Sequence, residues 1–393
     1  MNQNNENKTN NEITEISELD EEVIVKRRIP LFSKILLGIA GFCGILYILF
    51  LFIPAFSDLF NKYVSPIIRA FLSYQTTWIP FSLAEMLLIL IPVIIVVVVG
   101  IGAKYYSDSW RNVGVFFVIM ISIVSYVFST YALGFVPAYH GSTLDQKLGI
   151  DKQAVSAAEL EETALILAEA LREESKYVIY NGEGFSVMPY GYDELNDKLM
   201  DAYEKACEKY DFISPLHSNI KEVMLSEPMT YTHISGVYTF FTGEANLNVN
   251  FPDYVLPYTA AHEFAHQRGI AREDEANFVS FLVCMESDDP YIRYSAYLNV
   301  YEYVASALAS ADRDLYYKSY ASLSSDVHAE EDAYREFFEK YKKNVAADVS
   351  QAVNNSYLIS QGTPEGTRSY NLVVDLAVAY YKDQGLLPEV PPS

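Results

Sequence analysis

Cysteine and basic residues are both scarce in this chain of 393 residues. The three cysteines form no Cys-x-x-Cys pair, so there is no reason to expect a cysteine-ligated structural zinc site. Cys207 and Cys284 fall on predicted apolar helical faces, and their spacing leaves open whether they form a disulfide. Lysine and arginine number 28 against 51 acidic residues, which gives a formal net charge of −23. This charge disfavours nucleic acid as a partner, and without a glycine-rich phosphate loop nucleotide chemistry is not expected.

Long uncharged runs, by contrast, dominate the first third of the chain. Residues 35–56, 86–103 and 113–139 contain no charged side chain and are mostly apolar. A membrane-spanning helix needs about 20 such residues, and a buried helix of a soluble protein is rarely apolar on every side for so long. We therefore predict three spans in a lipid bilayer.

Basic residues near these runs predict the orientation in the cytoplasmic membrane. Most of them flank the first run or lie between the second and third runs, and fewer lie in the 57–85 segment. The first group is Lys26, Arg27, Arg28, Lys34, Lys104 and Arg111, and the second is Lys62 and Arg69. Because basic residues concentrate on the cytoplasmic side, the N-terminus is predicted inside and the chain after about residue 140 outside. The 57–85 segment is apolar in places and is expected to form an interfacial helix.

Composition divides the chain into three predicted parts. Residues 1–30 are a disordered cytoplasmic tail, because the first 20 are polar, Asn-rich and without periodicity. Residues 31–139 are the three-span region. Residues 140–393 are long enough for a separate extracytoplasmic domain.

The last part is predicted to be rich in helices. Residues 157–171, 195–207 and 334–341 carry apolar side chains at helical spacing. Residues 244–251 alternate polar and apolar side chains, which is typical of a half-buried strand. The expected fold class is mainly α, with three transmembrane helices followed by an α-rich (α+β) domain that contains a small sheet.

A His-Glu-x-x-His pattern at residues 262–266 is the most informative motif. On a helix, positions i and i+4 lie on one face, so His262 and His266 would present two imidazoles in the same direction. Such a pair can chelate Zn²⁺, and Glu263 beside it can act as the general base of a hydrolase. Gly269 is expected to end this helix, because glycine accepts the left-handed conformation.

A hydrolytic zinc site needs a third protein ligand and one open position. Glu273 and Glu275 are the candidates, since they follow the turn at Gly269. The structural alternative for both is an acidic residue in the first turn of a second helix, opposing the positive end of the helix dipole.

This order of motifs resembles two metallopeptidase families, the CAAX-prenyl/heat-shock proteases and the ImmA/IrrE-type proteases. In both, the first Glu of a Glu-x-x-Ala-Asn/Asp pattern after His-Glu-x-x-His is the zinc ligand. The resemblance therefore implies Glu273 as the third ligand and a supporting position for Asn277, while the shorter gap in this chain keeps Glu275 as the alternative. It also implies a zincin-like fold, in which the strand at 244–251 lies beside the zinc helix and pairs its free edge with substrate.

A wider resemblance covers most of the chain from Leu31 onward. The three apolar runs, the stretch Ile-Pro-Phe-Ser-Leu-Ala-Glu at 79–85, Thr-Gly-Glu-Ala at 242–245 and the motif at 262–277 are similar to the membrane family called domain of unknown function 3810. This resemblance implies an architecture but no substrate.

The expected function is a membrane-anchored zinc metallopeptidase at the outer face of the cytoplasmic membrane. Zn²⁺ would be held by His262, His266 and Glu273, and Glu263 would serve as the general base for hydrolysis of a peptide or protein substrate. The alternative is a non-catalytic envelope protein that keeps the fold as a binding or structural module. The candidates for the residue that stabilises the oxyanion are a downstream Tyr, Arg368 and Tyr370.

Overall fold

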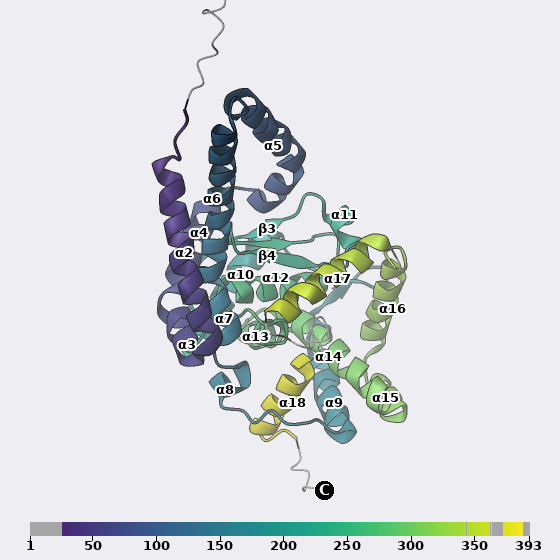
Figure 1. Cartoon of the computed structure of the whole chain (residues 1–393). Helices are drawn as coiled ribbons and strands as arrows, with labels where there is room; N and C mark the ends of the chain where they lie inside the picture. Colours follow the sequence, from purple (N-terminus) through teal and green to yellow (C-terminus); the bar gives the residue numbers. More distant parts are fainter. Residues whose placement is uncertain (1–25, 343, 362, 364–371, 388–393) are drawn as a thin grey trace, which may run out of the picture. The chain divides into compact units, whose positions relative to one another are not determined.

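The computed structural model describes residues 26–342, 344–361, 363 and 372–387. In this part the chain is mainly helical with two small sheets, as predicted (Figure 1). Of the predicted tail, residues 1–25 lie outside the described residues, and so do Arg368 and Tyr370.

Three helices are long and apolar enough to cross a membrane, and they coincide with the three predicted spans. They are α2 (Leu31–Phe52), α5 (Leu83–Tyr106) and α6 (Trp110–Gly134). The most apolar 18-residue window of α5 contains no buried residue, as expected for a helix whose sides face lipid. The prediction of a membrane protein is confirmed, and its orientation stays a prediction.

The chain forms two compact units. Of the described residues, the first contains those up to Ala40 and Leu90–Tyr126, and the second contains Gly41–Ile89 and those from Val127 onward. In the first unit the Arg27 backbone amide donates to Asn112 Oδ1 over 2.9 Å. The second unit holds the predicted metal ligands.

Two consecutive helices occupy the segment predicted to be interfacial. These are α3 (Pro54–Tyr63) and α4 (Ser65–Thr76), and each has a proline in its first turn, where the missing N–H is not needed. After α6 the chain forms two short helices, α7 (Val136–His140) and α8 (Leu144–Leu148).

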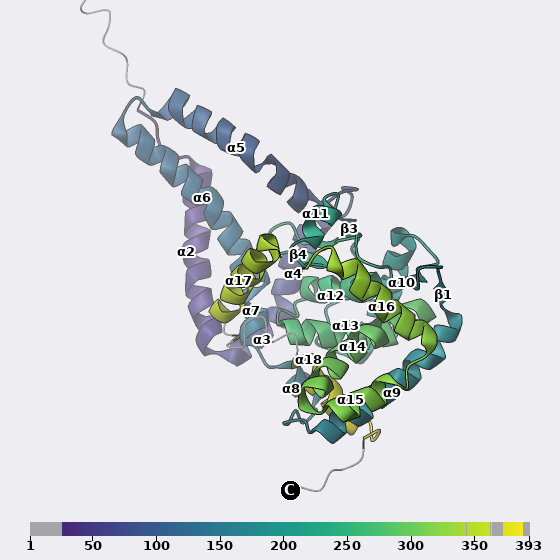
Figure 2. The ribbon, with the colours of Figure 1, turned by 90° about the vertical axis from the view of Figure 1, so that its right-hand side faces the viewer.

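The main core lies around a stack of three helices, α12 (Val255–Gln267), α13 (Glu273–Met285) and α14 (Pro290–Ala311) (Figure 2). α9 (Ala157–Glu174) packs along α14, and α10 (Tyr192–Lys209) packs on α13. α9 and α10 contain the predicted helices at 157–171 and 195–207. The remaining helices are α11 (Ser226–Thr230), α15 (Arg313–Tyr320), α16 (Ser325–Glu339), α17 (Val345–Ser360), α18 (Val373–Asp383) and the 3-10 turn η1 (Ser175–Tyr177).

Two sheets are present in the described residues. A short hairpin pairs β1 (Ile179–Tyr180) with β2 (Ser186–Val187). The larger sheet contains β3 (Ile220–Glu222), β4 (Gly236–Thr239) and β5 (Glu244–Leu247) in the order β3-β5-β4. β3 runs parallel to β5, whereas β4 runs antiparallel to it.

The predicted half-buried strand at 244–251 needs two corrections. The strand is shorter, since β5 ends at Leu247, and all four of its residues are buried. It is also the central strand of the sheet, so its edges are paired with β3 and β4. Ala245 and Leu247 belong to the main core. Glu244 and Asn246 are also buried, but their side chains form hydrogen bonds instead of apolar contacts. The alternation in sequence therefore reflects two different kinds of burial rather than a core face and a solvent face.

Candidate metal centre

α12 places the two motif histidines side by side. His262 and His266 lie one turn apart, and their ring centroids are 4.5 Å apart. The helix ends directly after them: Ile270 N donates to Ala265 O over 3.1 Å, and Gly269 has φ +91°. The predicted glycine stop is confirmed, and it turns the chain back toward the histidines.

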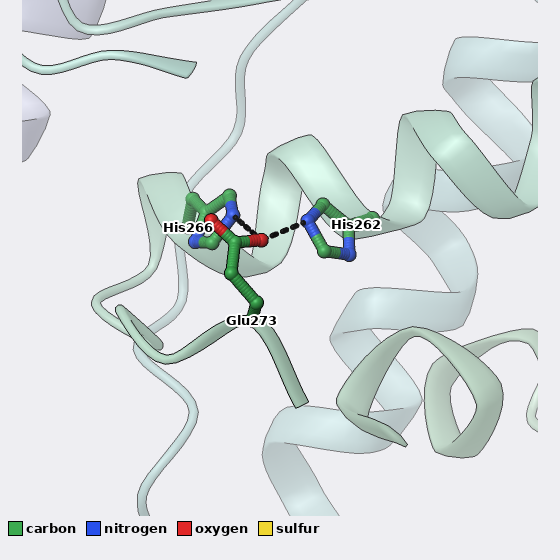
Figure 3. Close-up of side chains that lie close together, drawn as sticks. All are labelled: His262, His266 and Glu273. Atoms are coloured by element: carbon green, nitrogen blue, oxygen red, sulfur yellow. Dashed lines mark hydrogen bonds and ion pairs between the residues drawn. The ribbon is translucent and has the colours of Figure 1, made fainter. Parts of the chain in front are cut away.

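The first residue of α13 completes the cluster. The Glu273 Oε2 atom lies 3.2 Å from His262 Nε2 and 3.3 Å from His266 Nε2 (Figure 3). One ligand atom from each of the three residues lies within 4.8 Å of the others. The three residues predicted as metal ligands are thus brought together, all at least mostly buried.

Glu275, the alternative third ligand, points elsewhere. Its Oε1 accepts hydrogen bonds from Leu144 N over 3.0 Å and from Arg272 Nη1 over 3.2 Å. Because successive residues of a helix are rotated by about 100°, Glu273 and Glu275 lie on nearly opposite sides of α13 and cannot both face the histidines.

The donor set fits a tetrahedral zinc ion. Zinc–ligand bonds of about 2.0–2.1 Å at tetrahedral angles place neighbouring donors about 3.3 Å apart, close to the separations between Glu273 and the two imidazoles. His266 Nδ1 is 2.7 Å from Ile270 O, and a donated proton there leaves Nε2 free as a ligand. The same distances also suit an ion pair between Glu273 and protonated imidazoles.

Charges in the cluster depend strongly on one another. Burial lowers the pKa of His266, but the carboxylate of Glu273 outweighs this and raises that pKa to about 9. Burial also raises the pKa of Glu273, yet the two imidazoles hold it well below its usual range. Either a metal ion or a proton held on His266 can therefore balance the carboxylate.

Glu263 lies in a tight space between α12 and β4. It is 4% exposed, and its Oε2 has no hydrogen-bond partner among the described residues. A Cβ atom added to Gly236 would lie 2.6 Å from Glu263 Oε1, so a larger residue there would force the Glu263 side chain to shift. Burial raises the pKa of Glu263 to about 6, partly offset by the imidazoles and by the Tyr238 backbone amide.

Aromatic side chains that the sequence did not single out surround the cluster. The Phe135 ring lies 6.0 Å from the His266 ring and 5.5 Å from the Tyr238 ring. Tyr357 of α17 and Tyr303 of α14 both interact electrostatically with Glu273, and both belong to helices downstream of the motif. Aromatic residues are so common in this chain that only the tertiary structure shows which of them lie near the cluster.

Other predicted residues fall into structural positions. Asn277 lies one turn after Glu273, and its backbone oxygen accepts a hydrogen bond from the Tyr258 hydroxyl over 2.8 Å. Cys207 and Cys284 are free thiols, which answers the open question of a disulfide.

Comparison with known proteins finds one family and no curated or structural relative. Residues 60–378 match the family described as "Protein of unknown function (DUF3810)". No curated protein and no solved structure matches the chain. The resemblance to metallopeptidase families is therefore not supported by the comparisons, and the zincin-like fold stays a prediction. Because the match covers well over half of the 393 residues and includes the segments 79–85 and 242–277, the chain belongs to the DUF3810 family of proteins of unknown function.

Proposed function

We propose that this protein is a membrane-anchored, zinc-dependent peptidase. The observation that carries the proposal is the position of Glu273 Oε2, 3.2 and 3.3 Å from the Nε2 atoms of His262 and His266. A histidine pair on one helix and a carboxylate from the next is a three-ligand set, and three ligands leave a zinc coordination position open, as hydrolysis requires.

Glu263 is proposed as the general base. A bound zinc ion would supply Lewis acidity, lowering the pKa of water toward neutrality and polarising the scissile carbonyl. Glu263 follows His262 directly, and its unpartnered Oε2 is free to accept a proton from the attacking water. It would then pass this proton to the leaving amine.

The edge strand β4, rather than β5, is proposed to bind substrate. β4 pairs with β5 on one side only among the described strands, and it packs against α12. Its first residue, Gly236, touches Glu263, so a peptide paired along β4 would pass close to the base. Such pairing uses backbone hydrogen bonds and accepts many sequences.

A non-catalytic role is the second candidate, favoured by the ion-pair geometry of the same cluster. The pKa of His266 is raised and that of Glu273 lowered, so the two groups stabilise each other without a metal ion. In that case the cluster would tie the turn between α12 and α13 together as a structural element.

Metal content and cleavage, measured on the full chain in detergent, separate the two candidates. We expect one Zn²⁺ per purified chain, and its loss in His262→Ala, His266→Ala and Glu273→Ala. Glu263→Gln should retain the metal and lose at least about 10²-fold in peptide cleavage, because only the proton acceptor is removed.

Glu275→Gln is the matched control. It changes a carboxylate two residues from Glu273 that bonds to Leu144 N instead, and it should keep both metal and activity. A chain that is folded, metal-free and unaffected by zinc would favour the structural role. Full cleavage by Glu263→Gln would remove Glu263 as the base.

A further inference from the structure

The connection between the first two apolar helices has an unusual distribution of charge. Between Tyr63 and Ala84 the only charged residue is Arg69, and its side chain is 1% exposed. The exposed positions of this stretch are all uncharged, and most carry large apolar or aromatic side chains. They are Tyr63, Ile67, Phe71, Tyr74, Gln75, Trp78, Pro80 and Phe81.

α4 is consequently an amphipathic helix with its polar side facing the protein. Ser65, Arg69, Ser73 and Thr76 are buried, while Ile67 and Phe71 on the other side are 67% and 63% exposed. A helix on a water-facing surface shows the opposite arrangement. Exposure of one continuous apolar face is unfavourable in water and favourable in lipid.

Exposed apolar side chains also lie on α3 and just before α11. Leu59 of α3 is 55% exposed, and Met224, just before α11, is 63% exposed. Lys62 is the one charged residue on the exposed side of α3, and it pairs with Asp211 over 2.7 Å. We call this surface, made of Leu59, Tyr63, Ile67, Phe71, Tyr74, Trp78, Phe81 and Met224, the apolar rim.

Chain connectivity places the apolar rim next to lipid. α3 begins two residues after the end of α2, and α5 begins seven residues after the end of α4, so both neighbours along the chain are apolar helices able to span a membrane. Aromatic residues such as Trp78 and Tyr74 are also typical of the level where a bilayer meets water.

The polar side of α4 holds the end of the histidine helix. Arg69 Nη2 donates to Arg268 O over 3.3 Å, and Gln267 Nε2 donates to Ser73 Oγ over 3.1 Å. Asn61 of α3 donates to Gly269 O over 3.1 Å. These bonds involve the three residues that directly follow His266, so α3 and α4 fix the metal-binding end of α12.

The sheet is fixed to the start of α5 in a similar way. The Glu244 carboxylate of β5 accepts from Leu83 N and Ala84 N over 2.9 and 3.0 Å, which caps that helix. In return the Glu85 carboxylate accepts from Met224 N and Leu225 N over 2.8 and 2.7 Å. Two segments far apart in sequence, 79–85 and 224–244, are thus joined at the start of α5. The backbone amides of each segment bind a buried carboxylate of the other.

We propose that the apolar rim is embedded in the lipid leaflet nearest the C-terminal domain and holds the candidate metal site at the bilayer surface. The occupant of the rim is lipid, both acyl chains and headgroups. Combined with the peptidase function proposed above, on which this part depends, the geometry selects a class of substrate: protein segments a few residues from a membrane anchor.

The position of the rim is testable with the two native tryptophans, Trp78 and Trp110. In a Trp110→Phe variant Trp78 is the one remaining reporter, and Trp78→Phe gives the background. After reconstitution in vesicles, lipids brominated near the headgroup should remove about half of the Trp78 emission, and deeply brominated lipids less, because interfacial helices lie about 5–10 Å into this boundary. Aqueous iodide should quench weakly.

Two results would overturn the embedding. Strong quenching by iodide with none by brominated lipid would place Trp78 in water. Protection from both quenchers would mean that protein covers the rim, for example a second copy of the chain. None of these outcomes depends on peptidase activity.

The substrate class is tested with one random-sequence peptide pool carrying a fluorophore and a quencher. The pool is attached to vesicles that contain the full chain through either a short or a long flexible spacer, with the same number of peptides per vesicle in both cases. We expect cleavage about tenfold faster on the short spacer, because the long spacer lowers the local concentration at the bilayer surface. Glu263→Gln is the inactive control.

Equal rates on both spacers, or faster cleavage on the long one, would contradict the membrane-proximal substrate and leave the peptidase function standing. Absence of cleavage with either spacer or with free peptide, in a zinc-loaded chain, would instead remove the peptidase function.

Discussion

Gly236 shows how much of the candidate site depends on one missing side chain. A Cβ atom there would approach Glu263 Oε1 to 2.6 Å and Thr259 Cγ2 to 2.8 Å, distances that real Cβ atoms essentially never show. β4 can therefore lie against α12 only because this position is glycine. Nothing in the sequence marks Gly236, since it is one of 18 glycines.

Gly236→Ala should displace the Glu263 carboxylate while leaving the three metal ligands in place. We expect the zinc content to remain near that of the unchanged protein, cleavage to fall roughly 10- to 100-fold, and the free energy of unfolding to fall by about 1–3 kcal/mol from overpacking. Metal analysis, peptide cleavage and thermal unfolding measure the three effects.

Gly182→Ala is the control, because its added Cβ would have no atom within 4 Å. If Gly236→Ala cleaves as fast as Gly182→Ala, then the position of Glu263 does not govern the reaction.

At the level of elements, α14 and α16 bring three carboxylates close together, those of Glu302, Glu330 and Glu331. Burial raises the pKa of Glu302 to about 8, and the charges of Glu331 and Glu330 add to this, although a hydrogen bond from Tyr254 opposes it. The folded protein therefore holds a proton on Glu302 at a pH where an unfolded glutamate, with a pKa of about 4.3, has lost it. The stabilisation is complete below about pH 4 and is lost as the pH rises to about 8.

Glu302→Gln should flatten this dependence. We expect the unchanged chain to lose on the order of 2 kcal/mol of stability between pH 5 and 8.5, and the variant to lose clearly less, because glutamine does not ionise. Thermal unfolding of the detergent-solubilised chain across this range measures the difference.

Glu336→Gln on the exposed side of α16 is the matched control and should follow the unchanged chain. Parallel curves for all three proteins would show that Glu302 is ionised in the folded state.

In the whole molecule, the candidate metal site depends on residues of the segment between α2 and α5 as well as on residues that follow α6. Arg69 and Asn61 bind backbone oxygens at the end of α12, and Lys221 Nζ of β3 donates to Thr77 O over 3.2 Å. A fragment of residues 140–393 lacks these partners, and each hydrogen bond that is lost costs about 0.5–1.5 kcal/mol.

We therefore expect the 140–393 fragment to unfold at a lower temperature than the full chain and to hold less zinc. Limited proteolysis and metal analysis of both proteins in the same detergent test this. A fragment with the stability and metal content of the full chain would mean that α3 and α4 do not support the site.

Local patterns of the sequence were sufficient for several features. The apolar runs predicted the three membrane helices, because length and uniform hydropathy alone decide whether a helix can span a bilayer. His262 and His266 were predicted on one face because helical geometry is local, and Gly269 marked the end of their helix because few other residues adopt a positive φ. The family followed from the same segments.

Only the tertiary structure decided the rest, because it depends on partners distant in sequence. Glu273 rather than Glu275 faces the histidines since Leu144 and Arg272 bind Glu275. β5 is central rather than an edge strand because β3 and β4 both pair with it, and no local alternation of residues encodes pairing with other strands. The burial of Arg69 against α12 could not be read from the sequence, because Arg268, whose backbone oxygen it binds, lies 199 residues further along the chain.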